Sequence, residues 1–153
     1  MKLESPLPKD IRKLRVNNTL HGRSVWRKQN VRGHNVIHGY DSPGKGDGLD
    51  LFVPHGTPVR ACHDGRITRI AEPLGRLGCV YVEGSKVFTA YAHLHVRECL
   101  KLRDIISAGT LLGWVNGKII HNPHLHLEIW ENGKSVSAKS AKVLQDKFAT
   151  RFN

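Results

Sequence analysis

The chain has 153 residues, 39% of them hydrophobic, and its 24 lysine and arginine residues against 13 aspartate and glutamate residues give a formal net charge of +11. This length and composition predict one globular domain and exclude wholesale disorder, and no apolar run approaches the roughly 18 residues of a transmembrane helix. The charge indicates an anionic partner, which can be nucleic acid, a membrane surface or an acidic wall polymer.

The basic residues are unevenly spread along the chain. Residues 1–33 hold nine lysine and arginine residues and few acidic ones, so we predict a basic N-terminal arm there. This segment contains no apolar h-region, so we expect no signal peptide in this chain. The main domain is then predicted over residues 34–138, beginning with a glycine-rich irregular loop at 38–48. Apolar residues at helical spacing predict a short C-terminal helical tail over residues 139–153.

Short segments separated by turn signals fill the middle of the chain. Gly84-Ser85 predicts a hairpin between two of them, and Asn132-Gly133 predicts a turn after the last. Many short strands separated at regular intervals by turn residues favour an antiparallel all-β domain. The predicted strands cover residues 49–53, 58–62, 66–71, 79–84, 86–94, 110–115 and 124–130.

The chain has three cysteines, and three cannot all pair with one another. Cys62 and Cys79 lie in apolar segments, so we predict that they are buried free thiols. Because no Cys-x-x-Cys is present, a cysteine zinc site is not expected.

The tripeptide His124-Leu125-His126 is the most informative motif. Residues two apart in a strand share a face, so the two imidazoles lie side by side on a rigid element, as a metal site requires. A surface strand with two ordinary histidines explains the spacing equally well. Asp50, between two leucines, points either to solvent or into a polar site. His93 ends a long apolar strand.

In their order and spacing, four motifs resemble the lysostaphin/LytM-type zinc endopeptidases of bacterial cell walls. The resemblance covers residues 33–145 and implies a small twisted antiparallel β-sheet domain of the duplicated hybrid motif type, with a groove. The segments that carry it are GLDLFVPHGTPVRACHDGRI, TAYAHL, AGTLLGWV and NPHLHLEIWENGKSV.

The resemblance implies a zinc site with two catalytic histidines. Asp50 and His126 would be zinc ligands, since carboxylate and imidazole are ligands that zinc prefers. His124 would be a general base, and His93 would donate a hydrogen bond to the developing oxyanion.

One ligand of that pattern is missing, because Gly46 stands where the family has its first histidine, four residues before Asp50. We place His38 first among the substitutes, since the flexible loop can fold back, although a loop histidine in solvent explains it as well. His34 comes second and Asp47 third.

The leading functional prediction is a zinc-dependent endopeptidase that cleaves peptide bonds in peptidoglycan, with Zn²⁺ as cofactor and peptidoglycan or another anionic wall polymer as partner. The alternative is an inactive domain of this fold that binds the cell wall or a partner protein. A nucleic-acid-binding protein is disfavoured, because aromatic residues are only 7% and no nucleic-acid motif is present. The expected location is the cell wall, outside the cytoplasm, reached by phage-type release or after removal of a leader.

Overall fold

The computed structural model describes residues 3–8, 15–16, 24–31, 34–41, 49–71, 78–117 and 123–135. Side chains are described for residues 3–8, 50–71, 78–117 and 123–133. Every regular element in this part of the chain is a β-strand, and the strand pairs among the described residues are antiparallel, which confirms the predicted all-β class.

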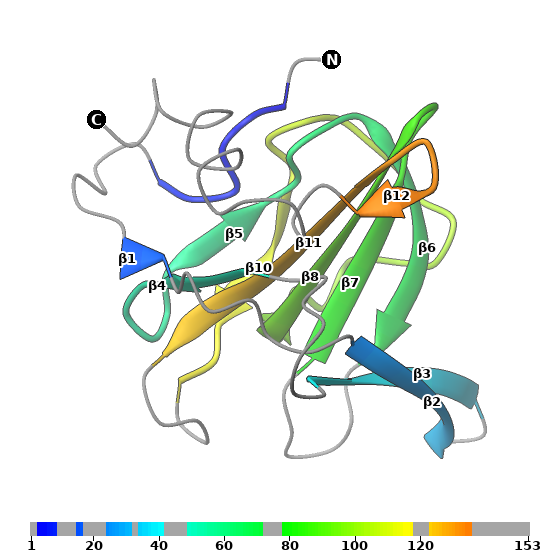
Figure 1. The fold of residues 1–153 in the computed structure, drawn as a ribbon, viewed down its shortest axis with the longest axis horizontal. Coiled ribbons are helices and arrows are strands. Elements are labelled where there is room, and N and C mark those ends of the chain that lie inside the picture. The colour runs from blue at the N-terminus through cyan, green and yellow to red at the C-terminus, as the bar shows by residue number, and fades with distance from the viewer. Residues whose placement is uncertain are drawn as a thin grey trace.

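Ten of the strands form one sheet, and the remaining two form a separate hairpin (Figure 1). The sheet runs in the order β1-β4-β11-β8-β7-β6-β9, while β10 pairs with both β5 and β8, and β12 pairs with β11. The separate hairpin is β2-β3, and β3 contacts β6. The strands are β1 Arg15–Val16, β2 Ser24–Val31, β3 His34–Asp41, β4 Leu49–Phe52, β5 Pro58–Arg60, β6 Gly65–Ala71, β7 Gly78–Glu83, β8 Val87–Val96, β9 Ile105–Ile106, β10 Leu111–Val115, β11 His124–Glu131 and β12 Lys134–Ser135.

The main core lies on one face of the sheet. Alternation along β11 points Leu125, Leu127 and Ile129 to this face, and all three are fully buried. The β5-β10 branch supplies Val59 and Leu112 to the same cluster. The core therefore lies between the long strands and this branch, and the opposite face carries a second, smaller apolar cluster, which includes Tyr81 and Ala90, beside polar side chains.

The predicted turns are present. Gly84 N–H donates to Val87 O at 2.7 Å and closes the β7-β8 hairpin. Asn132 and Gly133 have φ values of 52° and 75°, as a two-residue hairpin turn requires, and they join β11 to β12. Cys62 and Cys79 are buried free thiols, as predicted.

The described residues among the first 33 contribute to the fold. Leu3 and Leu7 are buried in the main core, and Arg60 N–H donates to Pro6 O at 2.9 Å. Strand β1 extends the sheet beside β4, and β2 lies in the hairpin with β3. The described residues of this segment are thus packed parts of the fold, while the boundaries at 33 and 138 stay predictions. The predicted helical tail lies outside the described residues.

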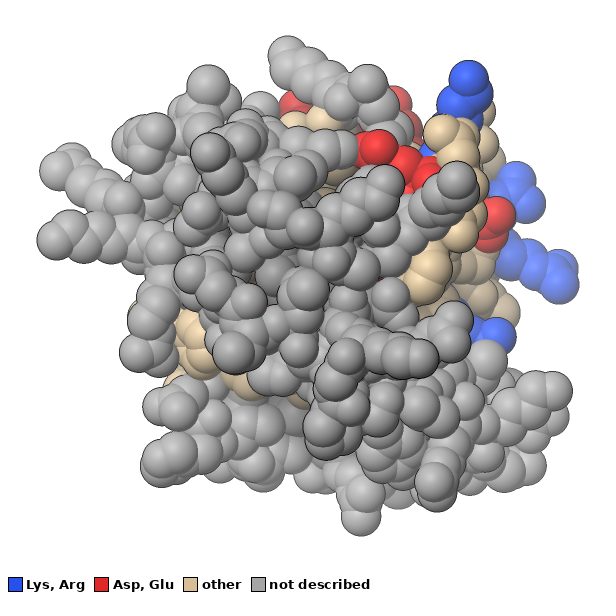
Figure 2. Space-filling model, viewed as in Figure 1, with Lys and Arg blue, Asp and Glu red and all other residues tan. Residues whose placement is uncertain are grey.

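The excess positive charge lies mostly outside the described side chains. These include seven of the 24 lysine and arginine residues but eight of the 13 aspartate and glutamate residues. In Figure 2 the described acidic and basic side chains lie next to one another along one side of the molecule. Among the described residues, no helix qualifies as a membrane span.

Candidate metal centre

Three neighbouring strands bring four of the predicted site residues together. His126 on β11 lies opposite Asp50 on β4 and opposite Ala92 on β8. His124 shares the face of His126, because the two residues are two apart on the same strand. His93 follows Ala92 directly. The pairing of β4, β11 and β8 thus gathers residues from three distant parts of the sequence, on the face opposite the core.

The carboxylate of Asp50 is the centre of this cluster. Its Oδ1 lies 3.3 Å from Nδ1 of His126 and 3.4 Å from Nε2 of His124. Asp50 is 4% exposed and His126 is 3% exposed. A carboxylate removed from water to this extent requires compensating partners, and the two imidazoles provide them.

Two aromatic rings, those of His93 and Phe52, pack against His124. The ring centroids of His93 and His124 lie 4.6 Å apart with an interplanar angle of 78°. The ring of Phe52 also contacts that of His124, with a centroid distance of 5.5 Å. The His93 ring is 5.7 Å from that of His126. His93 therefore lies close to both histidines of the motif.

A β-bulge places His93 on this face. Along β7, Cys79 pairs with Ala92 but the preceding residue, Gly78, pairs with Leu94, so His93 is an extra residue in β8. Its φ is 66°, in the left-handed region that non-glycine residues seldom adopt. Regular alternation would point His93 to the core face, together with Tyr91. The bulge re-aims its side chain to the face of His124 and His126, a known use of bulges near active sites.

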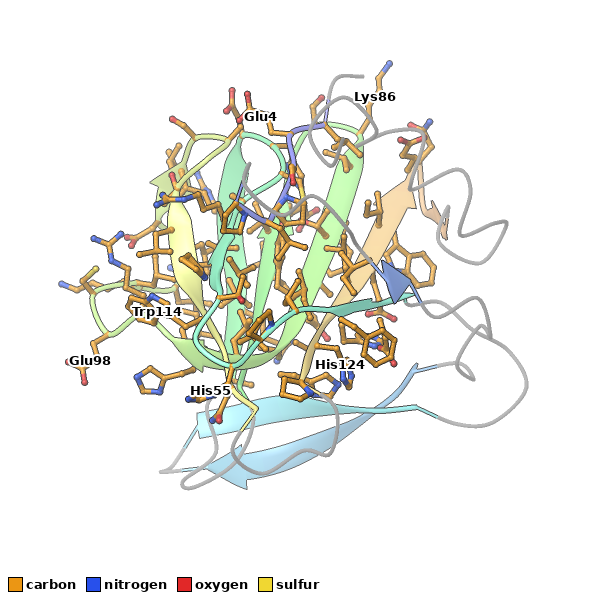
Figure 3. All side chains as sticks on the ribbon, turned by 90° about the vertical axis from the view of Figure 1, so that its left-hand side faces the viewer. Glu4, His55, Lys86, Glu98, Trp114 and His124 are labelled. Carbon is orange, nitrogen blue, oxygen red and sulfur yellow. The ribbon has the colours of Figure 1, made fainter. Side chains whose placement is uncertain are left out.

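Two loops, one containing His55 and the other containing Gly117, meet beside the first residue of β11 and form one rim of the site. Gly117 N–H donates to Nδ1 of His55 at 2.8 Å. A Cβ atom on Gly117 would lie 2.5 Å from Cγ of Pro123, the residue before His124. Figure 3 shows His55 and His124 at the same end of the sheet, with Lys86 at the opposite end. These loops therefore lie at the end of the sheet where His124 lies.

Sequence reasoning missed Glu128, which lies two residues beyond His126 on the same face. Its Oε1 is 3.9 Å from Nε2 of His126, and the residue is 1% exposed. The alternation that grouped His124 and His126 also includes Glu128 and could have found it.

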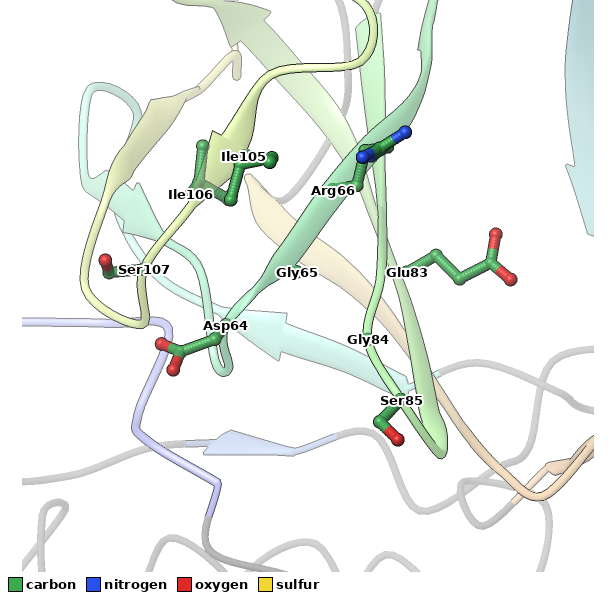
Figure 4. Close-up of a pocket in the computed structure, with 9 residues that line it drawn as sticks. All are labelled: Asp64, Gly65, Arg66, Glu83, Gly84, Ser85, Ile105, Ile106 and Ser107. Atoms are coloured by element: carbon green, nitrogen blue, oxygen red, sulfur yellow. The ribbon is translucent and has the colours of Figure 1, made fainter.

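Two surface pockets lie away from these residues. A pocket of about 440 Å³ is lined by Asp64–Arg66, Glu83–Ser85 and Ile105–Ser107 (Figure 4). A second, of about 480 Å³, lies beside the β7-β8 and β11-β12 turns and includes Trp130. Neither is lined by Asp50 or by any of the three site histidines, so the candidate site is distinct from both.

A family model described as peptidase family M23 matches residues 44–138, which is most of the chain. The chain belongs to this family. The resemblance to lysostaphin/LytM-type enzymes is thereby confirmed, and members of M23 are zinc metallopeptidases.

Curated relatives and solved structures agree with this assignment. Over 99 residues, the M23 chain is 35% identical to the DD-carboxypeptidase/endopeptidase Mpg of Neisseria meningitidis, which covers 63% of the chain and 22% of Mpg. A zinc-containing peptidase from Vibrio cholerae has the same fold, with a TM-score of 0.60, 23% identity and coverage of 92% of the chain and 40% of that structure. The catalytic domain of lysostaphin from Staphylococcus simulans matches with a TM-score of 0.53, 21% identity and coverage of 86% and 92%. The chain thus spans less than a quarter of Mpg.

The donor set of this M23 chain fits zinc in part. Asp50 and His126 offer a carboxylate oxygen and an imidazole nitrogen that face each other in a buried site. Among the residues that the structure describes, however, no group of three or more His, Cys, Asp or Glu side chains is arranged to hold a metal. A zinc site at Asp50 and His126 would therefore need a further ligand from elsewhere in the chain.

The proposed substitutes for the third ligand lie in or next to segments whose side chains are not described. His38 is on β3, where its backbone pairs with Arg27, and His34 begins the same strand. Gly46 and Asp47 lie outside the described residues. His38 therefore stays a prediction as a metal ligand.

Proposed function

We propose that this M23 chain is a zinc-dependent endopeptidase that cleaves peptide bonds in bacterial peptidoglycan. The observation that carries the proposal is the convergence of His126 and His124 on one buried oxygen of Asp50, with His93 turned toward them by a bulge. Membership of M23 supports the reaction class.

Each residue has a role that its position supports. Asp50 and His126 would hold the zinc, with His38 as the leading further ligand. When bound, zinc would act as a Lewis acid and lower the pKa of a water molecule at its open position. His124 would take the proton from that water, because its Nε2 already faces the metal-binding carboxylate. His93, beside His124, would donate a hydrogen bond to the carbonyl oxygen as negative charge develops there.

The substrate class follows from the relatives. Mpg and the peptidoglycan DD-endopeptidase ShyC of Vibrio cholerae are similar to this chain, at 35% and 29% identity. The positive charge of the chain favours an anionic wall polymer. We therefore place its action at the cell wall.

A second candidate is a domain of the same fold that binds the wall or a partner protein without cleaving it. It is favoured by Gly46 at the position of the family's first ligand, and by the lack of a three-donor group among the described residues. Zinc binding distinguishes the two candidates, because only the enzyme requires it.

The test is elemental analysis of the purified full chain before and after zinc loading, followed by digestion of peptidoglycan sacculi. We expect zinc uptake near one ion per chain, about the stoichiometry of a mononuclear catalytic site, and release of soluble peptides. A chain that takes up no zinc and still binds sacculi would favour the binding module.

Three variants test the division of roles. H126A is expected to lose zinc and hydrolysis together, whereas H124A keeps zinc and loses most hydrolysis. H95A, which changes an exposed histidine on β8, is the matched control and keeps both. Equal zinc loss in H126A and H124A would contradict the separate roles.

A further inference from the structure

The carboxylate of Glu128 is buried, and the apolar side chains of the core offer it no hydrogen-bond donor. It lies on β11 with Leu127 and Ile129 on either side, both pointing to the opposite face. Its Oε1 accepts no hydrogen bond from any described residue. Burial of an unpaired carboxylate is strongly unfavourable, so a group at this position is expected to serve a partner close by.

The nearest basic group is His126. Its Nε2 lies 3.9 Å from Oε1 of Glu128, while its Nδ1 lies 3.3 Å from Oδ1 of Asp50. The imidazole thus lies between two carboxylates, one at each nitrogen. Because Glu128 is on the far side of the ring from Asp50, it cannot join a metal held by Asp50 and Nδ1.

Two other polar groups, the Tyr81 hydroxyl and the Cys79 thiol, lie on this face. Glu128 and Tyr81 both lie opposite Ala90, whose small side chain leaves room between them. Burial raises the pKa of the Tyr81 hydroxyl and of the Cys79 thiol. Neither group is a stronger proton donor for Glu128 than an imidazole N–H.

We propose that Glu128 is a positioning residue for His126. Its carboxylate accepts the Nε2–H of His126, which leaves the lone pair of Nδ1 available to a metal held together with Asp50. Histidine ligands generally donate their second ring nitrogen to such an acceptor, which fixes both the tautomer and the ring orientation. The 3.9 Å contact is at ion-pair distance, so the hydrogen bond requires the ring or the carboxylate to move closer. This inference rests on the proposed role of His126 as a zinc ligand.

The test compares zinc affinity and stability in the full chain with the variants E128Q and E128L. Gln keeps one acceptor oxygen, whereas Leu keeps a similar volume and removes the acceptor. We expect E128L to bind zinc about 10- to 100-fold more weakly than the wild type, with E128Q in between. E128L should unfold at no lower temperature than the wild type, because an apolar side chain replaces a buried charge.

The control is I129V, which removes one methyl group from the core face of the same strand. It is expected to lower stability without changing zinc affinity. If Glu128 had only a structural role, zinc affinity and stability would fall together in E128L. Unchanged zinc affinity in E128L would overturn the proposal.

A second readout does not depend on zinc. Nitrogen-15 NMR of the metal-free protein shows which ring nitrogen of His126 carries a proton. We expect a proton on Nε2 in the wild type and its loss from Nε2 in E128L, where only Asp50 remains as an acceptor. If the wild type took up no zinc, the proposed function would fail while this comparison still tested the positioning role. An Nε2 without a proton in the wild type would overturn it.

Discussion

The backbone of His93 offers a sharp test of how the site is built. A non-glycine residue in the left-handed region costs about 1–2 kcal/mol relative to its ordinary conformations. At φ 66°, His93 carries this cost, and glycine would not. We therefore expect H93G to be more stable than H93A, although glycine normally destabilises a strand relative to alanine.

The magnitude follows from two opposing terms. Glycine avoids about 1–2 kcal/mol of left-handed strain, but it loses about 0.5–1 kcal/mol more backbone entropy than alanine on folding. The difference leaves H93G more stable than H93A by about 0.75 kcal/mol at the centre of the two ranges, or about 1.5–3 °C in melting temperature for a chain of this size. Both variants lack the imidazole, so their contacts with His124 and His126 are equally lost and cancel in the comparison.

Urea unfolding followed by tryptophan fluorescence measures the difference, with A92G as the control. Ala92 lies next to the bulge but still pairs with Cys79 and His126, and its φ is not positive, so glycine there is expected to lower stability by about 0.5–1 kcal/mol. Hydrolysis of sacculi should be lost in H93G and H93A but retained in A92G. An H93A variant as stable as H93G would refute the assignment of His93 as a strained bulge residue.

Two further predictions concern stability and the rim of the site. His63 is buried, and its Nε2 is hydrogen-bonded to the Thr89 hydroxyl. Burial lowers the pKa of His63 below the ordinary 6.5, so the unfolded chain binds more protons than the folded chain. The free energy of unfolding should therefore fall as the pH falls through 6.5. Melting temperatures at about pH 7.5 and about pH 5.5 should differ less in H63Q than in the wild type, and an equal pH effect in both would contradict this. G117A should lower both stability and hydrolysis, because its Cβ would lie 2.5 Å from Pro123, whereas G133A, at φ 75° with open space around it, should lower stability alone. Normal hydrolysis in a folded G117A would show that the rim tolerates displacement.

The sheet was predictable where one of its faces enters the core. In β11 the alternation of histidine with Leu125, Leu127 and Ile129 marked the strand and its buried face. Asn132-Gly133 marked the following turn by residue type alone. The sequence alone therefore predicts that the histidines and leucines of β11 lie on opposite faces of the strand. This prediction includes His124 and His126, two of the four candidate site residues.

Other parts depend on pairings that the sequence does not display. Strands β2 and β3 are rich in polar and charged residues without a clear apolar alternation, so no pattern indicated them. The bulge at His93 arises because Gly78 and Cys79 on β7 pair with residues two apart on β8. Regular alternation along β8 would predict that the His93 side chain enters the core. The irregular pairing of β8 with β7 is needed to place it on the opposite face.

The costs built into the site face favour the enzyme over the binding module. His93 is held in a strained conformation, Glu128 is a buried carboxylate, and Asp50 is buried between two imidazoles. Each feature opposes folding, and none adds apolar contact to the core. A surface that only binds a wall polymer requires exposed polar groups and gains nothing from buried ones. Strain and buried charge concentrated at one point are typical of sites where side chains must be held in exact orientation for chemistry. A third metal ligand from outside the described residues would complete such a site, which is why zinc uptake by the full chain decides between the two functions.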